Sequence, residues 1–135
     1  MANYPELSGR VALITGAAQG IGAETARLFA QQGSKVAIVD IDADNGSKIA
    51  AAITRAGGTA QAFSTDITDV ASVEQAIAGI AKTFGGIDII INCAGGYGRL
   101  ATVEDMPIDE WDRTVALNLR SVFLIFPMRA TAHFT

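Results

Sequence analysis

Three closely spaced glycines follow the first strongly apolar run of the chain. The segment TGAAQGIG, Thr15 to Gly22, comes directly after the run RVALIT and opens into a helical pattern. In such a strand–turn–helix unit, Gly16 allows a tight turn, Gly20 lets a pyrophosphate approach the backbone, and Gly22 lets the helix pack close to the strand. The helix N-terminus then offers free N–H groups and the positive end of its dipole to phosphates. The spacing G-x-x-x-G-x-G therefore predicts a dinucleotide-binding turn.

An acidic residue ends the second apolar run, VAIVD. Asp40 lies eighteen residues after Gly22, where a carboxylate can accept hydrogen bonds from the 2′- and 3′-hydroxyls of an adenosine ribose. Its charge would repel a 2′-phosphate, and the next basic residue is Lys48. The pattern therefore favours NAD over NADP. Taken without the glycines, a solvated aspartate at the end of a strand is the alternative interpretation.

Alternating strands and helices must position these residues. Four runs are predicted as strands: RVALIT, VAIVD, TAQAFS and IDIIIN. RVALIT, VAIVD and IDIIIN lack the polar alternation of half-exposed strands, which is typical of strands buried on both faces of a parallel sheet. Helices are predicted at Ile21 to Gln32, Ala43 to Ala56 and Val70 to Phe84, with a further helix from about Ile108. Because right-handed crossovers join parallel strands, the sequence predicts a doubly wound α/β sheet of strand order 3-2-1-4.

The composition limits the classes of protein. A chain of 135 residues, half of them apolar and 18% charged, is expected to form one globular domain. Its net charge of −4 disfavours nucleic acid and anionic membranes as partners. The apolar runs are too short to span a bilayer, and the N-terminus lacks the apolar stretch of a signal peptide, so we expect a cytoplasmic protein. A single cysteine excludes an intrachain disulfide, and no metal site is predicted.

Further motifs follow the glycine-rich turn and Asp40. They are DI at Asp66-Ile67, NCAG at Asn92 to Gly95, and NL at Asn118-Leu119. In this order and spacing, from about Leu7 to Leu124, they closely resemble the short-chain dehydrogenase/reductase family. The resemblance implies a Rossmann-type sheet and an oxidoreductase that transfers hydride between NAD and an alcohol or ketone. It also implies that an intact member forms a homo-oligomer.

The resemblance assigns twelve residues to cofactor binding. They are Gly16, Gln19, Gly20, Ile21, Gly22, Asp40, Ile41, Asp66, Ile67, Asn92, Ala94 and Gly95. Asp66 would hold the adenine through its side chain, and Ile67 through its backbone. NCAG resembles the family's Asn-Asn-Ala-Gly, with Cys93 at the second position. We interpret Cys93 as a small buried hydrophobe, because no histidine lies near it in the sequence. Asn92 ends a buried strand, so its amide is expected to need partners.

The helix predicted from Ile108 carries an asparagine beside an apolar stripe. Five residues at steps of three or four are expected to form one inward face: Ile108, Trp111, Val115, Leu119 and Val122. Asn118 lies at the edge of this stripe, and its amide must be satisfied by backbone, water or ligand. One interpretation is a structural asparagine bonded to the main chain. By resemblance, Asn118 is instead the asparagine of an Asn-Ser-Tyr-Lys tetrad, which holds a water that links the lysine to a proton relay.

The other members of that tetrad are not found in these 135 residues. A Tyr-x-x-x-Lys motif is absent, because Tyr4 and Tyr97 are the only tyrosines and neither has a lysine four residues later. We therefore expect a truncated or frameshifted chain, or a fragment, that supplies the cofactor-binding half and is inactive alone. A truncated sheet would leave the apolar edge of its fourth strand bare, so we also expect poor solubility or association.

The last residues of the chain are expected to diverge from the family. The resemblance fades after Leu124, and Pro127 is expected to break the helix because it removes an N–H and clashes with the preceding turn. Residues 125–135 are therefore predicted to be a divergent or disordered tail, in which His133 has no catalytic role.

Two other functions fit part of the pattern. A non-catalytic nucleotide-binding module or degenerate fragment would keep the glycine-rich turn and lack the tetrad. A methyltransferase that binds S-adenosylmethionine would also use a glycine turn and an acid after the second strand. It would not be expected to carry NCAG and an inward asparagine as well, so it ranks last.

Overall fold

Strands and helices alternate along the chain as the sequence predicts. The computed structural model describes residues 2–132, and the side chains of residues 2–126. The elements are η1 (Pro5–Leu7), β1 (Val11–Thr15), α1 (Gly20–Gln31), β2 (Lys35–Asp40), α2 (Ala43–Arg55), β3 (Thr59–Ser64), α3 (Val70–Phe84), β4 (Ile89–Asn92), α4 (Ile108–Val115), the π-helical turn η2 (Ala116–Arg120) and α5 (Ser121–Ala132). The four predicted strands and the first three predicted helices are confirmed, with ends that differ by at most two residues.

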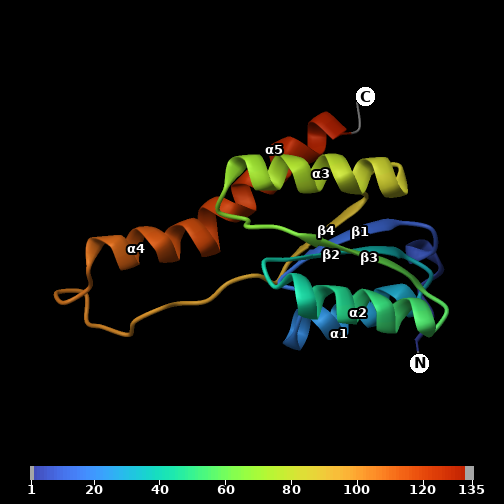
Figure 1. Cartoon of the computed structure of the whole chain (residues 1–135), viewed down its shortest axis with the longest axis horizontal. Helices are drawn as coiled ribbons and strands as arrows, with labels where there is room; N and C mark the ends of the chain where they lie inside the picture. The colour runs from blue at the N-terminus through green and yellow to red at the C-terminus, as the bar shows by residue number, and fades with distance from the viewer. Residues whose placement is uncertain (1, 133–135) are drawn as a thin grey trace.

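The sheet is parallel and its strand order is β3-β2-β1-β4, which confirms the predicted topology. Figure 1 shows α1 and α2 against one face of the sheet and α3 with α5 against the other. In the central strand, Thr15 pairs with Val39 of β2 on one side and with Asn92 of β4 on the other. The carboxyl ends of these three strands therefore lie side by side, which is where ligands bind in open α/β sheets.

Each face of the sheet has its own hydrophobic core. Successive side chains of a strand point to opposite faces, so Leu13 packs towards α3 and α5 while Ile14 packs towards α1 and α2. In β2, Val39 packs towards α3 and α5, and Ile38 packs towards α1 and α2. This two-sided burial is the physical reason why β1 and β2 lack polar alternation.

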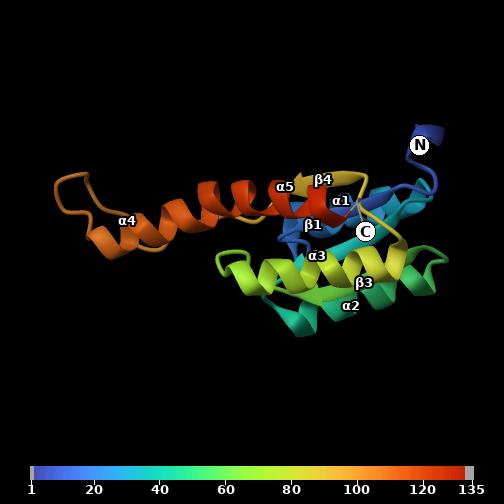
Figure 2. The same ribbon diagram turned by 90° about the horizontal axis from the view of Figure 1, so that it is seen from above.

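After β4 the chain leaves the sheet. The arm, which we define as residues 93–120, consists of an extended loop, α4 and η2, and Figures 1 and 2 show its loop and α4 lying beyond the end of the sheet. The prediction that five residues of the helix from Ile108 point inward is wrong for three of them. Ile108 is 79% exposed, Trp111 60% and Leu119 68%. Periodicity identifies side chains that share a face of a helix, but it does not provide a surface to cover that face.

Helix α5 returns to the body of the molecule and packs along α3 (Figure 2). Its Ile125 is 2% exposed and belongs to the core between the sheet and α3. The helix continues through Pro127 to Ala132, so the expected break at Pro127 is wrong. A proline removes one helical hydrogen bond, and tertiary packing of the kind that α5 makes with α3 usually supplies most of a helix's stability. His133 and the last two residues lie outside the described residues.

Candidate functional site

A cleft of about 430 Å³ opens at the carboxyl ends of β1, β2 and β4. This volume falls in the range of about 300–1,000 Å³ that is usual for small-molecule sites. Ten of the twelve predicted cofactor-binding residues line it, all except Asp66 and Asn92. The lining residues are Gly16, Gln19, Gly20, Ile21, Gly22, Val39, Asp40, Ile41, Ile67, Cys93, Ala94, Gly95 and Leu117.

The three glycines of the turn have different roles. Gly16 has a φ of +63°, and a Cβ there would lie 2.7 Å from the backbone nitrogen of Ala94. A Cβ on Gly22 would collide with the carbonyl oxygen of Gly16, so α1 packs against the turn that leaves the strand. A Cβ on Gly20 would meet no other atom within 4 Å. Two glycines therefore permit close packing, while the backbone of Gly20 faces open space.

The first turn of α1 presents N–H groups at this cleft. The helix begins at Gly20, and the side chain of its N-cap residue, Gln19, does not cap it. The first N–H groups of a helix have no partner within the helix, so an anion in the cleft can accept their hydrogen bonds. The turn and the helix together form an anion-binding surface.

Asp40 lies at the end of β2 and faces the turn. Its Oδ2 accepts a hydrogen bond from the N–H of Ala18 at 3.0 Å, and its Oδ1 accepts one from the N–H of Asp42 at 3.0 Å. Each carboxylate oxygen has two lone pairs, so both oxygens can accept a further hydrogen bond from a ligand hydroxyl.

Asp66 and Ile67 follow β3 but differ in their relation to the cleft. Ile67 lines it, whereas the carboxylate of Asp66 bonds within its own loop. Its Oδ1 accepts from the hydroxyl of Thr68 at 2.6 Å and from the N–H of Thr68 at 2.9 Å. These two bonds, the hydroxyl first, hold the pKa of Asp66 below its usual value and outweigh the opposing effect of burial.

The loop after β4 borders the cleft beside β1, on the side away from Asp40. The N–H of Ala94 donates to the hydroxyl of Thr15 at 3.1 Å, which joins the ends of β4 and β1. Cys93 is half-buried against the core under α1 and also lines the cleft, a position that its interpretation as a buried hydrophobe missed. Asn92 is exposed and lies outside the lining, so the expectation of a buried amide is wrong.

Asn118 in η2 joins the arm's helix to its loop. Its Oδ1 accepts from the N–H of Gly96 at 3.0 Å, and its Nδ2 donates to the carbonyl of Gly96 at 2.7 Å and to that of Thr114 at 2.8 Å. This geometry fits the interpretation of a main-chain-bonded asparagine. Asn118 does not line the cleft, but a Cβ on the lining residue Gly95 would lie 2.7 Å from its Oδ1.

Sequence reasoning missed three apolar residues of the cleft: Val39, Cys93 and Leu117. Val39 and Cys93 are neighbours of predicted residues, so position along the motif could have indicated them. Leu117 is likewise a neighbour of the predicted Asn118, although it lies outside the apolar stripe predicted for this helix.

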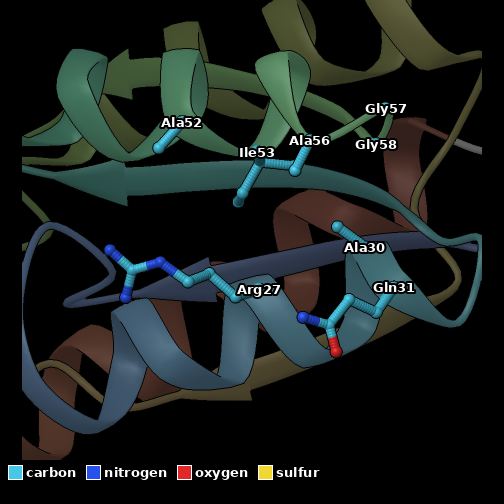
Figure 3. A pocket seen from close by; sticks show the side chains of 8 residues that line it. All are labelled: Arg27, Ala30, Gln31, Ala52, Ile53, Ala56, Gly57 and Gly58. Carbon is cyan, nitrogen blue, oxygen red and sulfur yellow. The ribbon is translucent and has the colours of Figure 1, made fainter.

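A second hollow lies between α1 and α2, at the ends of these helices that are remote from the glycine-rich turn (Figure 3). Small side chains dominate its wall, and Arg27 is the one charged residue among those that line it. It therefore offers no pair of groups for acid–base or nucleophilic chemistry.

Residues 2–132 lack two further features. Among them, no group of three or more histidine, cysteine, aspartate or glutamate side chains is placed to hold a metal ion. Within the same residues, no helix has the length and apolar character needed to cross a membrane.

The fold and the cleft together define a class of protein. A parallel sheet is covered by helices on both faces, and its central strand opens through glycines into a helix. The next strand ends in an acid beside that turn. This is the arrangement of a doubly wound, Rossmann-like fold.

The family model for "short chain dehydrogenase" matches residues 10–132, and the chain belongs to this family of oxidoreductases. The match extends past Leu124, where the resemblance was expected to end. It thus includes the whole of α5.

Similar proteins include several dehydrogenases. D-threitol dehydrogenase of Mycolicibacterium smegmatis is 43% identical over 119 residues, which are 88% of this chain and 45% of that protein. A 2,3-dihydro-2,3-dihydroxybenzoate dehydrogenase of Bacillus subtilis is 36% identical, over 90% of this chain and 46% of that one. The crystal structure of a hydroxysteroid dehydrogenase from Escherichia coli matches with a TM-score of 0.88 at 36% identity, over 93% of this chain and 53% of that one. The chain thus spans about half the length of the relatives it matches.

Proposed function

We propose that this chain binds NAD(H) in the cleft at the carboxyl ends of β1, β2 and β4, as the cofactor-binding half of an alcohol or ketone oxidoreductase. The observation that carries the proposal is the joint position of the glycine-rich turn and Asp40 on one cleft. Anion-binding N–H groups and a hydroxyl-binding carboxylate are the two features that a dinucleotide requires.

The residues of the cleft fit the parts of this cofactor. The open space at Gly20 and the first turn of α1 would hold the pyrophosphate. Asp40 would accept hydrogen bonds from the adenosine ribose, and Ile67 would lie against the adenine. Ala94 and Gly95 would run along the nicotinamide half. When bound, the nicotinamide supplies hydride chemistry.

The charge at the end of β2 supports NAD over NADP. The carboxylate of Asp40 lines the cleft and would repel a 2′-phosphate. Asp42 and Asp44 follow it and add further negative charge.

The names of similar proteins support a substrate that carries hydroxyl groups. They include dehydrogenases of D-threitol and of galactitol, which are both polyols. We therefore propose a secondary alcohol, or the ketone formed from it, as the substrate of the whole oxidoreductase.

These 135 residues contain no Tyr-x-x-x-Lys motif, so we propose that the chain binds cofactor without turnover. A non-catalytic nucleotide-binding module is the second candidate function, and the same missing motif favours it.

Titration with NADH and NADPH, followed by nicotinamide fluorescence and calorimetry, tests the proposal. We expect NADH to bind at least about tenfold more tightly than NADPH, because one unfavourable charge contact of about 1.4 kcal/mol changes affinity tenfold. Tighter binding of NADPH would contradict the role of Asp40, and no binding of either would contradict the proposal itself. A hydride-transfer assay with NAD and D-threitol should show no turnover, and measurable turnover would show that the chain is not inactive alone.

A further inference from the structure

The glycine-rich turn is attached to the end of β2 at two points. The N–H of Gly16 donates to the carbonyl of Val39 at 2.9 Å. The N–H of Ala18 donates to Oδ2 of the Asp40 side chain at 3.0 Å. The first attachment uses the backbone and is independent of the amino acid at position 39, whereas the second depends on a carboxylate at position 40.

The backbone of Asp40 cannot replace its side chain in this contact. Its carbonyl oxygen points away from the turn, towards β3, where it accepts from the N–H of Thr65 at 2.8 Å. The turn around Ala18 is also shielded from water, since Ala17 is 0% exposed and Ala18 is 5% exposed. An N–H in such a place costs about 1–3 kcal/mol when it loses its partner.

The second oxygen of the same carboxylate fixes the start of α2. Oδ1 accepts from the N–H of Asp42 at 3.0 Å, and Asp42 is the N-cap of α2. One side chain therefore connects the glycine-rich turn, the end of β2 and the entry into α2. Hydrogen bonds of backbone N–H groups to an ionised acceptor are about twice as strong as those to a neutral one.

We propose that Asp40 is a positioning residue for the glycine-rich turn, in addition to the contact with ribose hydroxyls that the proposed function gives it. The carboxylate holds the Ala18 N–H and so sets the position of the backbone between Gly16 and Gly20. Asp40 should then strengthen the binding of nucleotides that have no ribose hydroxyls to offer. The inference rests on the proposed function for its nucleotide site, but the contact itself is present without a ligand.

Asp40 would then affect cofactor specificity in two ways. An exchange of Asp40 for a neutral or basic residue removes the repulsion of a 2′-phosphate and also releases the turn that binds the pyrophosphate. We therefore expect such variants to lose NADH affinity without a matching gain in NADPH affinity.

The test compares ADP with 2′,3′-dideoxy-ADP in the unaltered chain and in Asp40→Asn, by calorimetry. If Asp40 only contacted the ribose hydroxyls, dideoxy-ADP would bind the unaltered chain and Asp40→Asn equally. Positioning predicts that dideoxy-ADP binds Asp40→Asn about tenfold more weakly, since the amide cannot satisfy both N–H groups as an acceptor. Equal affinities of the two proteins for dideoxy-ADP would overturn the proposal. Asp112→Asn, which neutralises an exposed acid of α4 outside the cleft, is the matched control and should leave both affinities unchanged.

Amide hydrogen exchange in the absence of nucleotide gives a second, independent readout. In Asp40→Asn, exchange at Ala18 should be about tenfold faster, while exchange at Thr65, which bonds to the backbone of Asp40, should stay slow and show that the sheet is intact. Unchanged exchange at Ala18 would overturn the proposal. If the unaltered chain bound no nucleotide at all, the proposed function would fail, and this exchange measurement would still decide whether Asp40 positions the turn.

A second variant removes the donor and keeps the carboxylate. Incorporation of lactic acid at position 18 replaces the N–H by an ester oxygen and leaves Asp40 free to contact the ribose. We expect this variant to bind ADP and dideoxy-ADP more weakly by the same factor. A variant that retained full affinity for both would overturn the proposal, including in the case that Asp40→Asn fails to fold.

Discussion

Helix α3 and the arm's helix show the same sequence pattern with opposite structural outcomes. Both carry apolar residues at steps of three or four. In α3, Val73, Ile77 and Ile80 are buried against the sheet, whereas Ile108 and Trp111 in α4 are exposed. The difference lies in what faces the stripe. Helix α3 returns over the sheet, while α4 lies beyond its end (Figure 1).

Truncation of one stripe residue in each helix gives the largest expected contrast. Ile80→Ala should lower the free energy of unfolding by about 3 kcal/mol, because it leaves a cavity in a core where Ile80 is fully buried. Leu119→Ala in the arm should change it by less than about 0.5 kcal/mol. Urea denaturation of both variants measures the contrast. A large loss in Leu119→Ala would mean that the arm's apolar face is covered in solution.

A second contrast compares Gly16 in the glycine-rich turn, where backbone strain and crowding combine, with Gly57, where only backbone strain is expected. Gly16→Ala should cost about 2 kcal/mol or more, because it places a Cβ both at a positive φ and against the backbone of Ala94. Gly57→Ala, at a positive φ with open space around it, should cost about 1 kcal/mol. Thermal unfolding of both variants gives the difference. Equal losses would show that Ala94 can move away from the turn.

The body of the molecule could be predicted from sequence, since short-range patterns determine most of it. Strands buried on two faces and right-handed crossovers led to the observed strand order. The cleft followed from these, because Gly16 and Asp40 lie at the ends of adjacent strands. The hydrogen bond from Ala18 to Asp40 was not predictable in this way, since it depends on a rotamer and on the path of the turn.

The arm was predicted less well, and the reasons are physical. The residues of η2 are ordinary helix formers, and nothing in ALNLR distinguishes a π-helical turn from an α-helix. Beyond the arm, proline propensity predicted a break at Pro127, but α5 packs along α3 and continues. At Pro127 tertiary packing outweighed a local rule, whereas at η2 the sequence carries no local signal.

Removal of the Asn118 side chain tests how the arm is held. Asn118→Ala deletes three hydrogen bonds, to the N–H and carbonyl of Gly96 and to the carbonyl of Thr114. Because these groups are exposed to water, we expect a local loss of about 1 kcal/mol, seen as about fivefold faster exchange at the Gly96 amide. Leu119→Ala on the same helical turn is the control. Unchanged exchange at Gly96 would show that the loop keeps its position without the asparagine.

The smallest expected effect concerns acid stability in the body. Because the folded pKa of Asp66 lies below its unfolded value, its bonds stabilise the fold above the unfolded pKa of about 3.9 and are lost as pH falls through the folded pKa. Thr68→Val removes the hydroxyl donor and should cost a few tenths of a kcal/mol at pH 7 and less near pH 2. Denaturation at both pH values, with the exposed Thr83→Val as control, measures the difference. If the loss of stability in Thr68→Val did not depend on pH, its source would not be the hydrogen bond to the Asp66 carboxylate.

The π-helical turn also sets the angular phase of everything that precedes it in the arm. An α-helix advances by about 100° for each residue, and a π-helical turn accommodates one extra residue within an otherwise α-helical path. Residues on the two sides of Ala116–Arg120 are therefore offset by about that angle from the positions that an uninterrupted α-helix would give them. A stripe counted at steps of three or four through this turn, from Ile108 to Val122, therefore does not stay on one face of the helix.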